Sequence, residues 1–194
     1  MGECLGVIVT GSHAMVTDEL PWSLKTELFI RELVKSNIPL LGICYGHQLI
    51  AKSLGGHVDF NPKGMELGTV SISTNANAKN DEIFKNFPQT FDVHAVHAQS
   101  VLKLPTNAVL LASNDFDKNH IFKIEPCTWG VQFHPEYNES IMKSYIHEVL
   151  KDEIGESEKE NKLIKNVKNT LYANKIIKIF VDIAKMNQSL ESKI

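Results

Sequence analysis

The sequence predicts a three-layer α/β protein, in which an open and mostly parallel sheet lies between layers of helices. Two apolar, strand-like runs at residues 5–10 and 39–44 are each followed by a segment of helical periodicity. This order is typical of parallel strands joined by helical crossovers. The chain has 194 residues, of which 43% are hydrophobic and 22% charged, so it is long and apolar enough to bury a core.

The first elements alternate between strand and helix. Residues 5–10 (LGVIVT) and 39–44 (PLLGIC) are short apolar runs, which predict buried strands. A helix is expected over residues 24–34, whose apolar side chains keep mostly to one face: Leu24, Leu28, Ile30, Leu33 and Val34. A second helix is expected to start after Gly46 and to stop at Gly55.

The middle of the chain is richer in strands. The alternating or apolar runs that predict them lie at residues 68–74, 93–96 and 109–112, with two more inside residues 121–133, joined near Pro126. A helix over residues 140–150 follows.

The composition changes after residue 150. Residues 151–161 are dense in charge and predict a solvated connector or a helix start. Apolar residues then recur at helical spacing over residues 163–184, which indicates one or two amphipathic helices. We therefore expect a domain at residues 1–150 and a helical C-terminal extension at residues 151–194. The extension is expected to complete the core, to form the face of a homo-oligomer or to dock a partner.

The composition argues against several classes of protein. With 20 Lys and Arg against 23 Asp and Glu, the net charge of −3 gives no general attraction to nucleic acid or anionic membranes. No apolar run is long enough to cross a bilayer, and no signal peptide is visible. The three cysteines are too few and too scattered for a disulfide framework, so a cytoplasmic location is expected. No GxGxxG or P-loop motif predicts a nucleotide cofactor.

The most informative segment is residues 42–46 (GICYG), between an apolar strand and a helix. Such a G-x-nucleophile-x-G elbow lifts its central residue, here Cys44, above the sheet. The two glycines permit the tight turn, and a helix N-terminus stabilises a thiolate. The alternative is a buried structural cysteine between packing glycines. Cys4 and Cys127 lack this setting, and a structural role is expected for both.

A nucleophilic cysteine needs a base, and His134 is the best candidate. It lies at the end of an apolar strand in residues 130–136 (GVQFHPE), a position where open α/β sheets build their sites. Glu136, two residues further on, can hold the imidazole by a carboxylate hydrogen bond. Without the cysteine elbow, an ordinary loop would be the preferred interpretation.

Residues 42–48 (GICYGHQ) together with residues 131–136 (VQFHPE) resemble the class I glutamine amidotransferases of the Cys-His-Glu type. The resemblance covers most of residues 5–150 and implies a flavodoxin-like fold. Residues 9–18 (VTGSHAMVTD) and the helical tail are most similar to stand-alone proteins that resemble the amidotransferase domain of GMP synthase.

This resemblance implies a reaction. Cys44 would attack the side-chain amide of glutamine, His134 would protonate the leaving ammonia and then activate water, and Glu136 would orient His134. The products are glutamate and ammonia, and the ammonia passes to an acceptor on a synthetase partner. Two alternatives remain open: hydrolysis of γ-glutamyl peptides, and a catalytically silent binding module of the same fold.

The resemblance also implies the residues around the substrate. The backbone N–H groups of Tyr45 and of the loop Gly11-Ser12 are expected to hold the oxyanion. The family often has a second glycine where Ser12 stands, and an aspartate where Gln99 stands. The expected substrate contacts are Gln48, His97, Ala98 and Gln99. For Gln48, a polar residue on the first helical turn is an equally good interpretation.

No metal site is expected from the sequence. His94 and His97 are three residues apart with no evident partner cluster, so ordinary strand or loop histidines are predicted. The remaining histidines are expected to have surface or packing roles: His13, His47, His57, His120 and His147.

The N-terminus departs from the family pattern. Members of the family normally have a strand and a helix before the segment that corresponds to residues 5–10. This chain starts almost at that strand. We expect either that it is a fragment or an alternative start, or that another segment or subunit covers the position.

Overall fold

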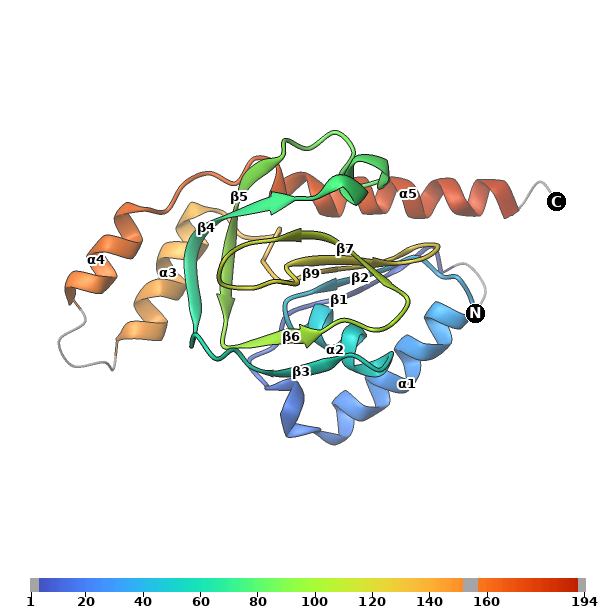
Figure 1. The fold of residues 1–194 in the computed structure, drawn as a ribbon, viewed down its shortest axis with the longest axis horizontal. Helices are drawn as coiled ribbons and strands as arrows, with labels where there is room; N and C mark the ends of the chain where they lie inside the picture. Colours follow the sequence, from blue (N-terminus) through green and yellow to red (C-terminus); the bar gives the residue numbers. More distant parts are fainter. Residues whose placement is uncertain (1–3, 152–156, 192–194) are drawn as a thin grey trace.

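A seven-stranded sheet forms the centre of the computed structural model, which describes residues 4–151 and 157–191 (Figure 1). Its parallel part consists of β1 (Val7–Val9), β2 (Leu40–Ile43) and β9 (Thr128–Val131), with β2 between the other two. All four residues of β2 and all four of β9 are buried, as expected for parallel strands covered on both faces.

The other half of the sheet is antiparallel. It continues from β9 through β8 (Ile121–Ile124), β7 (Ala108–Ser113), β4 (Glu66–Thr74) and β5 (Thr90–His97). The open α/β sheet is confirmed, but the expectation that it is mostly parallel is wrong. Three residues connect β8 to β9, and so short a connection can join only antiparallel strands.

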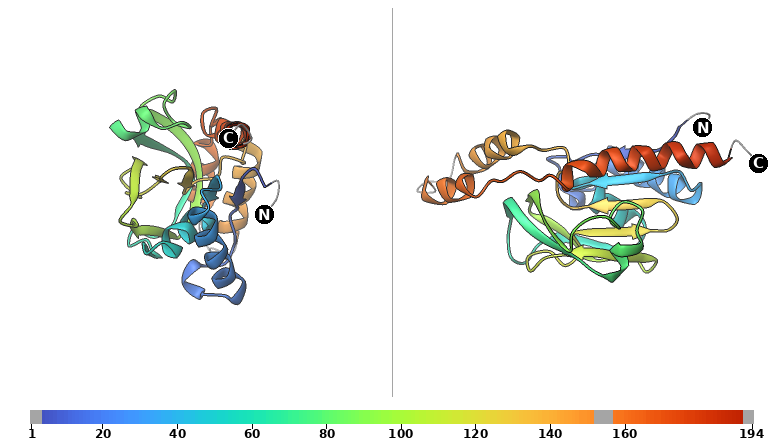
Figure 2. Two further views of the ribbon diagram at one scale, coloured as in Figure 1. Left: turned by 90° about the vertical axis from the view of Figure 1, so that its right-hand side faces the viewer. Right: turned by 90° about the horizontal axis from the view of Figure 1, so that it is seen from above.

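Helices cover both faces of the sheet and give the three predicted layers (Figures 1 and 2). On one face, α1 (Pro21–Lys35) and α2 (Tyr45–Ser53) pack together. Their apolar side chains share a core with β8: Ile30, Leu33, Leu49, Ile50 and Phe122. On the other face, α5 (Ile176–Glu191) buries Ile176 and Phe180 against the sheet, where Phe180 contacts Trp129.

Only part of the predicted face of α1 is buried: Ile30 and Leu33 are buried as expected. Leu24 and Leu28 are 43% and 60% exposed, whereas Glu27 is buried. The Glu27 carboxylate forms ion pairs with Arg31 at 3.1 Å and Lys52 at 3.2 Å. A buried carboxylate with two cationic partners is compatible with a core-facing position. The spacing of apolar residues gives no sign of such a buried charge.

Two further helices pack at one end of the sheet. In α3 (Glu139–Leu150), the buried side chains of Met142, Ile146 and Leu150 lie against Leu67 and Val96 of the antiparallel strands. α4 (Ser157–Lys165) packs beside α3. Residues 152–156 of the predicted charged connector lie outside the described residues.

A second sheet was not predicted. β3 (His57–Phe60) pairs antiparallel with β6 (Gln99–Lys103), in a region where no strand was expected. β3 is only four residues long and only its Val58 is buried, so the alternation that predicts a strand is too short to recognise.

Within the described residues, β1 pairs only with β2 and is an edge strand. Gly6 just before it lies under α5, since a Cβ at Gly6 would be 3.1 Å from the Cβ of Ala184. Because α5 adds Ile176 and Phe180 to the core, completion of the core is the favoured role for the C-terminal helices. The division of the chain at residue 150 stays a prediction.

None of the helices in the described part of the chain is both long and apolar enough to cross a bilayer.

Candidate active site

Cys44 lies on a strained turn between β2 and α2. Its backbone has φ 51° and ψ −101°, in the left-handed half of the conformational map that non-glycine residues rarely occupy. Such strain is frequent at functional sites. The neighbouring glycines are required by packing, because a Cβ at Gly42 would be 2.6 Å from Gly46 backbone atoms. A Cβ at Gly46 would be 2.0 Å from the Val9 carbonyl oxygen. The turn therefore has the geometry of the predicted elbow.

Gly46→Ala tests this packing. We expect the substitution to lower the free energy of unfolding by about 3 kcal/mol, because the new methyl group meets the backbone of β1 and forces it to move. Urea-induced unfolding measures the change. Gly55→Ala is the matched control: Gly55 has φ 90° but open space around it, so only backbone strain of about 1–2 kcal/mol is expected. Equal losses for the two variants would contradict the packing argument.

His134 and Glu136 form a directly hydrogen-bonded pair beyond the end of β9. The imidazole Nδ1 is 2.7 Å from Glu136 Oε1, while the backbone N–H of His134 donates to the His94 carbonyl oxygen at 2.8 Å. The imidazole stacks on the ring of Tyr137 with 4.1 Å between centroids, and Tyr137 stacks on Tyr145 at 5.0 Å. These contacts fix both the orientation of the ring and the nitrogen that Glu136 engages.

The electrostatics of the site link His134 to Cys44. Burial by itself lowers the pKa of His134, but hydrogen bonds with Cys44 and Glu136, and the charges of both groups, raise it to about 9. The imidazole is therefore protonated at neutral pH. The Cys44 Sγ also lies 3.7 Å from the carbonyl oxygen of Val96 in β5.

One cavity of about 600 Å³ contains the predicted site. All ten residues singled out from the sequence line it: Gly11, Ser12, Cys44, Tyr45, Gln48, His97, Ala98, Gln99, His134 and Glu136. Further lining residues had no recognised sequence signal: Thr10, His13, Ala14, Met15, Met65, Val96, Tyr137, Tyr145, Glu148 and Val149. Several of these come from α3 and from the loop after β1, which only the fold brings beside the elbow.

The expected oxyanion donors lie next to the elbow. Tyr45 is the first residue of α2, and the first N–H groups of a helix have no intrahelical partner. Gly11 lies against His134, since a Cβ there would be 2.9 Å from the His134 Cε1 atom. The Ser12 side chain is turned to its own loop, where Oγ accepts a hydrogen bond from the Ala14 N–H at 3.1 Å.

The side chains of Gln48 and Gln99 hydrogen-bond within the protein. Gln48 Nε2 donates to the Gln99 carbonyl oxygen at 2.7 Å and to Gln132 Oε1 at 3.1 Å. Gln99 Oε1 accepts from the Val16 N–H at 3.0 Å, and its Nε2 donates to Thr17 Oγ1 at 2.6 Å. These bonds build the pocket wall, and contact of either residue with a substrate stays a prediction.

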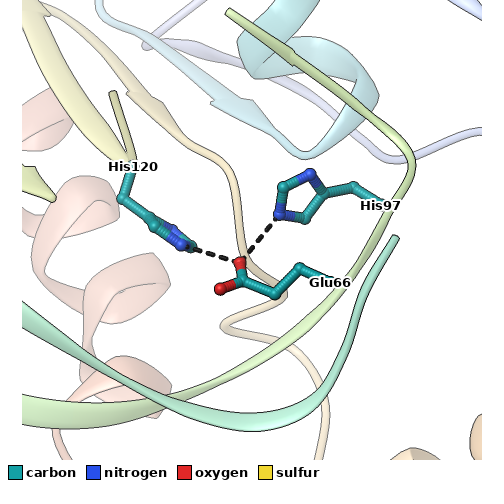
Figure 3. A group of neighbouring side chains, drawn as sticks. All are labelled: Glu66, His97 and His120. Carbon is teal, nitrogen blue, oxygen red and sulfur yellow. Dashed lines mark hydrogen bonds and ion pairs between the residues drawn. The ribbon is translucent and has the colours of Figure 1, made fainter. Parts of the chain in front are cut away.

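His97 belongs to a buried cluster behind this wall (Figure 3). Its Nε2 and that of His120 each lie 2.9 Å from Glu66 Oε2. The expectation that His97 has no partner cluster is therefore wrong, and His120 has a polar partner in addition to the packing role expected for it. Burial alone raises the pKa of Glu66, but the interactions with the imidazoles of His120 and His97 hold that pKa well below its usual range. His94 lies apart from the cluster, with Nδ1 3.1 Å from Thr69 Oγ1.

No sequence pattern indicated this cluster, because His97 and His120 lie 31 and 54 positions after Glu66 along the chain. Two other histidines also have partners that were not expected. His147 Nδ1 lies 2.8 Å from Glu160 Oε1, and His13 Nε2 lies 3.4 Å from the Tyr145 hydroxyl.

The fold and the site together define an α/β protein with a cysteine on a strand-to-helix elbow and a His-Glu pair in the same cavity. The sequence model of the glutamine amidotransferase class-I family matches residues 3–154. The chain belongs to this family.

The chain is also similar in sequence to individual proteins of this family. The chain is 35% identical over 147 residues to γ-glutamyl peptidase 4 of Arabidopsis thaliana, an alignment that covers 75% of this chain and 59% of the relative. It is 32% identical over 182 residues to the glutamine-hydrolyzing GMP synthase of Borreliella burgdorferi, covering 89% of this chain and 34% of the synthase. The chain thus spans only part of the length of these curated relatives.

A solved structure supports the fold. A glutamine amidotransferase from Thermotoga maritima superimposes with a TM-score of 0.74 at 24% identity, covering 91% of this chain and 77% of that one. At this identity, the similarity supports the fold alone.

Proposed function

We propose that this chain hydrolyses the side-chain amide of glutamine through a thioester on Cys44, releasing glutamate and ammonia. The observation that carries the proposal is the shared cavity, in which Cys44 stands on a strained elbow and helps to raise the pKa of the His134 imidazole. This combination of nucleophile, base and orienting carboxylate is the arrangement that acyl transfer requires.

The first half of the reaction forms the thioester. The Cys44 thiolate attacks the amide carbon, and the carbonyl oxygen becomes an oxyanion held by the backbone N–H groups of Tyr45 and the Gly11-Ser12 loop. The C–N bond breaks as His134 transfers its proton to the departing nitrogen, which leaves as ammonia. A pKa of about 9 suits this role, because the imidazole carries the needed proton at neutral pH.

The second half releases glutamate. His134, now neutral, takes a proton from a water molecule as that water attacks the thioester carbon. The C–S bond breaks, glutamate leaves, and the Cys44 thiolate and the His134 imidazolium are restored. Glu136 holds the imidazole in one orientation throughout, through the hydrogen bond to Nδ1.

We further propose that the ammonia serves a synthetase partner in the cytoplasm. A GMP synthase is among the relatives, and the chain corresponds to only 34% of its length. The rest of such an enzyme has no counterpart in this chain, so an acceptor site has to come from another polypeptide or segment. A reducing compartment also suits a protein that depends on a free thiol at Cys44.

A second candidate is hydrolysis of γ-glutamyl peptides. The cavity of about 600 Å³ is within the range that holds ligands larger than a single amino acid, and it extends past Cys44 to Tyr145, Glu148 and Val149. The similarity to a γ-glutamyl peptidase favours the same interpretation. In this reaction the leaving group is the amino acid or peptide that was linked to the γ-carboxyl group through its amino group, instead of ammonia.

Glutamate release separates these functions. The purified chain is assayed with glutamine and with a γ-glutamyl dipeptide. Asparagine, which is one methylene shorter, is the control, and its hydrolysis is followed as aspartate and ammonia because it cannot yield glutamate. Faster glutamate release from glutamine supports the amidotransferase proposal, and faster release from the dipeptide supports the peptidase. Binding of glutamine without release of glutamate, with or without an added synthetase, would instead indicate the silent binding module.

The pH dependence tests the role of Glu136. Because the His134 pKa is about 9, kcat/KM is expected to persist up to that pH and to fall above it, as the proton donor is lost. Glu136→Gln removes a group that raises this pKa, so the alkaline limb moves to lower pH. Glu148→Gln is the matched control, because Glu148 lines the same cavity but pairs with Lys151. An unchanged alkaline limb in Glu136→Gln would rule out the proposed link.

A further inference from the structure

The fold gathers one carboxylate and two imidazoles at a single buried point. Glu66 begins β4, His97 ends β5 directly opposite it, and His120 precedes β8. Figure 3 shows both imidazoles directed at the same carboxylate oxygen, Oε2, each at 2.9 Å. The three candidate ligand atoms lie within 4.8 Å of one another, and the side chains are only 0–5% exposed.

The hydrogen bonds fix the state of His97. Its Nδ1 lies 2.9 Å from the Gln99 carbonyl oxygen, which can only accept, so Nδ1 carries the hydrogen. In the neutral ring, Nε2 then presents a lone pair to a carboxylate oxygen at 2.9 Å. Two electron-rich atoms at this distance repel each other unless a second proton or a cation lies between them.

A neighbouring side chain orients Glu66 for the same purpose. Asn114 Nδ2 donates to Glu66 Oε1 at 2.7 Å, which leaves Oε2 directed at the imidazoles. His120 Nδ1 is buried without a hydrogen-bond partner, so no neighbour fixes which of its two ring nitrogens carries the hydrogen. Carbonyl and amide partners behind the ligands, as seen for His97 and Glu66, are typical of metal sites.

We propose that Glu66, His97 and His120 bind one divalent transition-metal ion, for which Zn²⁺ is the best match. Zinc takes imidazole nitrogens and carboxylate oxygens at about 2.0–2.2 Å, whereas magnesium and calcium prefer oxygen ligands throughout. A small expansion of the cluster admits such bonds, and water completes the coordination.

The ion would have a structural effect on the cavity. It would join the start of β4, the end of β5 and the residue before β8, directly behind the wall formed by His97, Ala98 and Gln99. It does not take part in the proposed hydrolysis, so its presence and the activity of Cys44 are separate questions.

Metal content tests the proposal. The full chain with Cys44→Ser is stripped with a chelator and equilibrated with Zn²⁺, and its zinc content is measured by mass spectrometry. The substitution removes the Cys44 thiolate as a competing zinc ligand. One zinc per chain is expected. Loss of an outer partner typically weakens metal binding by about 10–100-fold, so this range is expected for Asn114→Ala and at least 100-fold for Glu66→Gln or His120→Asn. His57→Asn, at an exposed position, is the control and should bind normally.

A second measurement does not require any substitution at the proposed metal ligands, so it does not depend on whether such variants fold. Co²⁺ added to the stripped Cys44→Ser chain is expected to give the visible absorption of a tetrahedral nitrogen–oxygen site, and Zn²⁺ should displace it. Zinc that stays at background in this chain, or that binds equally after folded Glu66→Gln, would overturn the proposal. Circular dichroism establishes that each variant is folded.

Discussion

Cys44→Ala is expected to abolish glutamate release, lowering kcat by about 10⁶-fold, which is the usual effect of deleting the nucleophile of a hydrolase triad. The reason is that no other group described in the cavity is a comparable nucleophile. Cys127 is buried elsewhere and its thiol donates to the Asn37 carbonyl oxygen at 3.1 Å, while Cys4 is exposed near the N-terminus. Glutamate release is measured beside Cys127→Ala, which should retain activity if it folds. An active Cys44→Ala variant would contradict the thioester mechanism.

Covalent labelling gives an independent measurement of the same group. An electrophile that mimics glutamine should modify Cys44 and leave Cys4 and Cys127 unmodified, as peptide mass spectrometry can establish. This test needs no synthetase partner, because it depends on thiolate reactivity and glutamine recognition alone. Labelling that persists in Cys44→Ala would count against the assignment. Protection of Cys44 by excess glutamine would support recognition of the γ-amide.

His134→Ala is expected to have the second-largest effect, a fall in turnover of about 10²–10⁴-fold, which is the range for a general acid–base group. Both half-reactions lose their proton carrier in this variant. The Tyr137 ring also loses its stacking partner, so thermal unfolding is measured to separate a structural effect from a catalytic one. His147→Ala, whose histidine is exposed and pairs with Glu160, is the control. A near-normal rate in folded His134→Ala would remove His134 from the mechanism.

The elbow could be predicted because its constraints are local. The sequence of residues 42–46 places two glycines around Cys44, and the structure provides a reason for each, since a side chain at either position would meet backbone atoms. Likewise, His134 and Glu136 are two residues apart, so a short turn is enough to bring them together. The strands and helices around these motifs were predictable from apolar runs of ordinary length.

The wrong predictions concern residues and strands whose place in the fold depends on distant parts of the chain. Apolar periodicity assigned Leu24 and Leu28 to the buried face of α1, but Glu27 is buried there because α2 supplies Lys52 beside it. The sheet is only partly parallel, and the antiparallel part begins at β8, which a three-residue connection joins to β9. β3 and β6 are short strands, and each can be recognised as a strand only from its pairing with the other.

The α/β class, the family and the candidate nucleophile with its base could therefore be predicted from the linear chain, since each depends on neighbouring residues whose backbone geometry is short-range. The groups behind the pocket could be identified only from the three-dimensional arrangement. Glu66 and His97 meet through strand register, and His120 joins them from a third strand end. Contacts of this kind depend on how strands pair across the whole sheet, and a linear pattern does not contain that information.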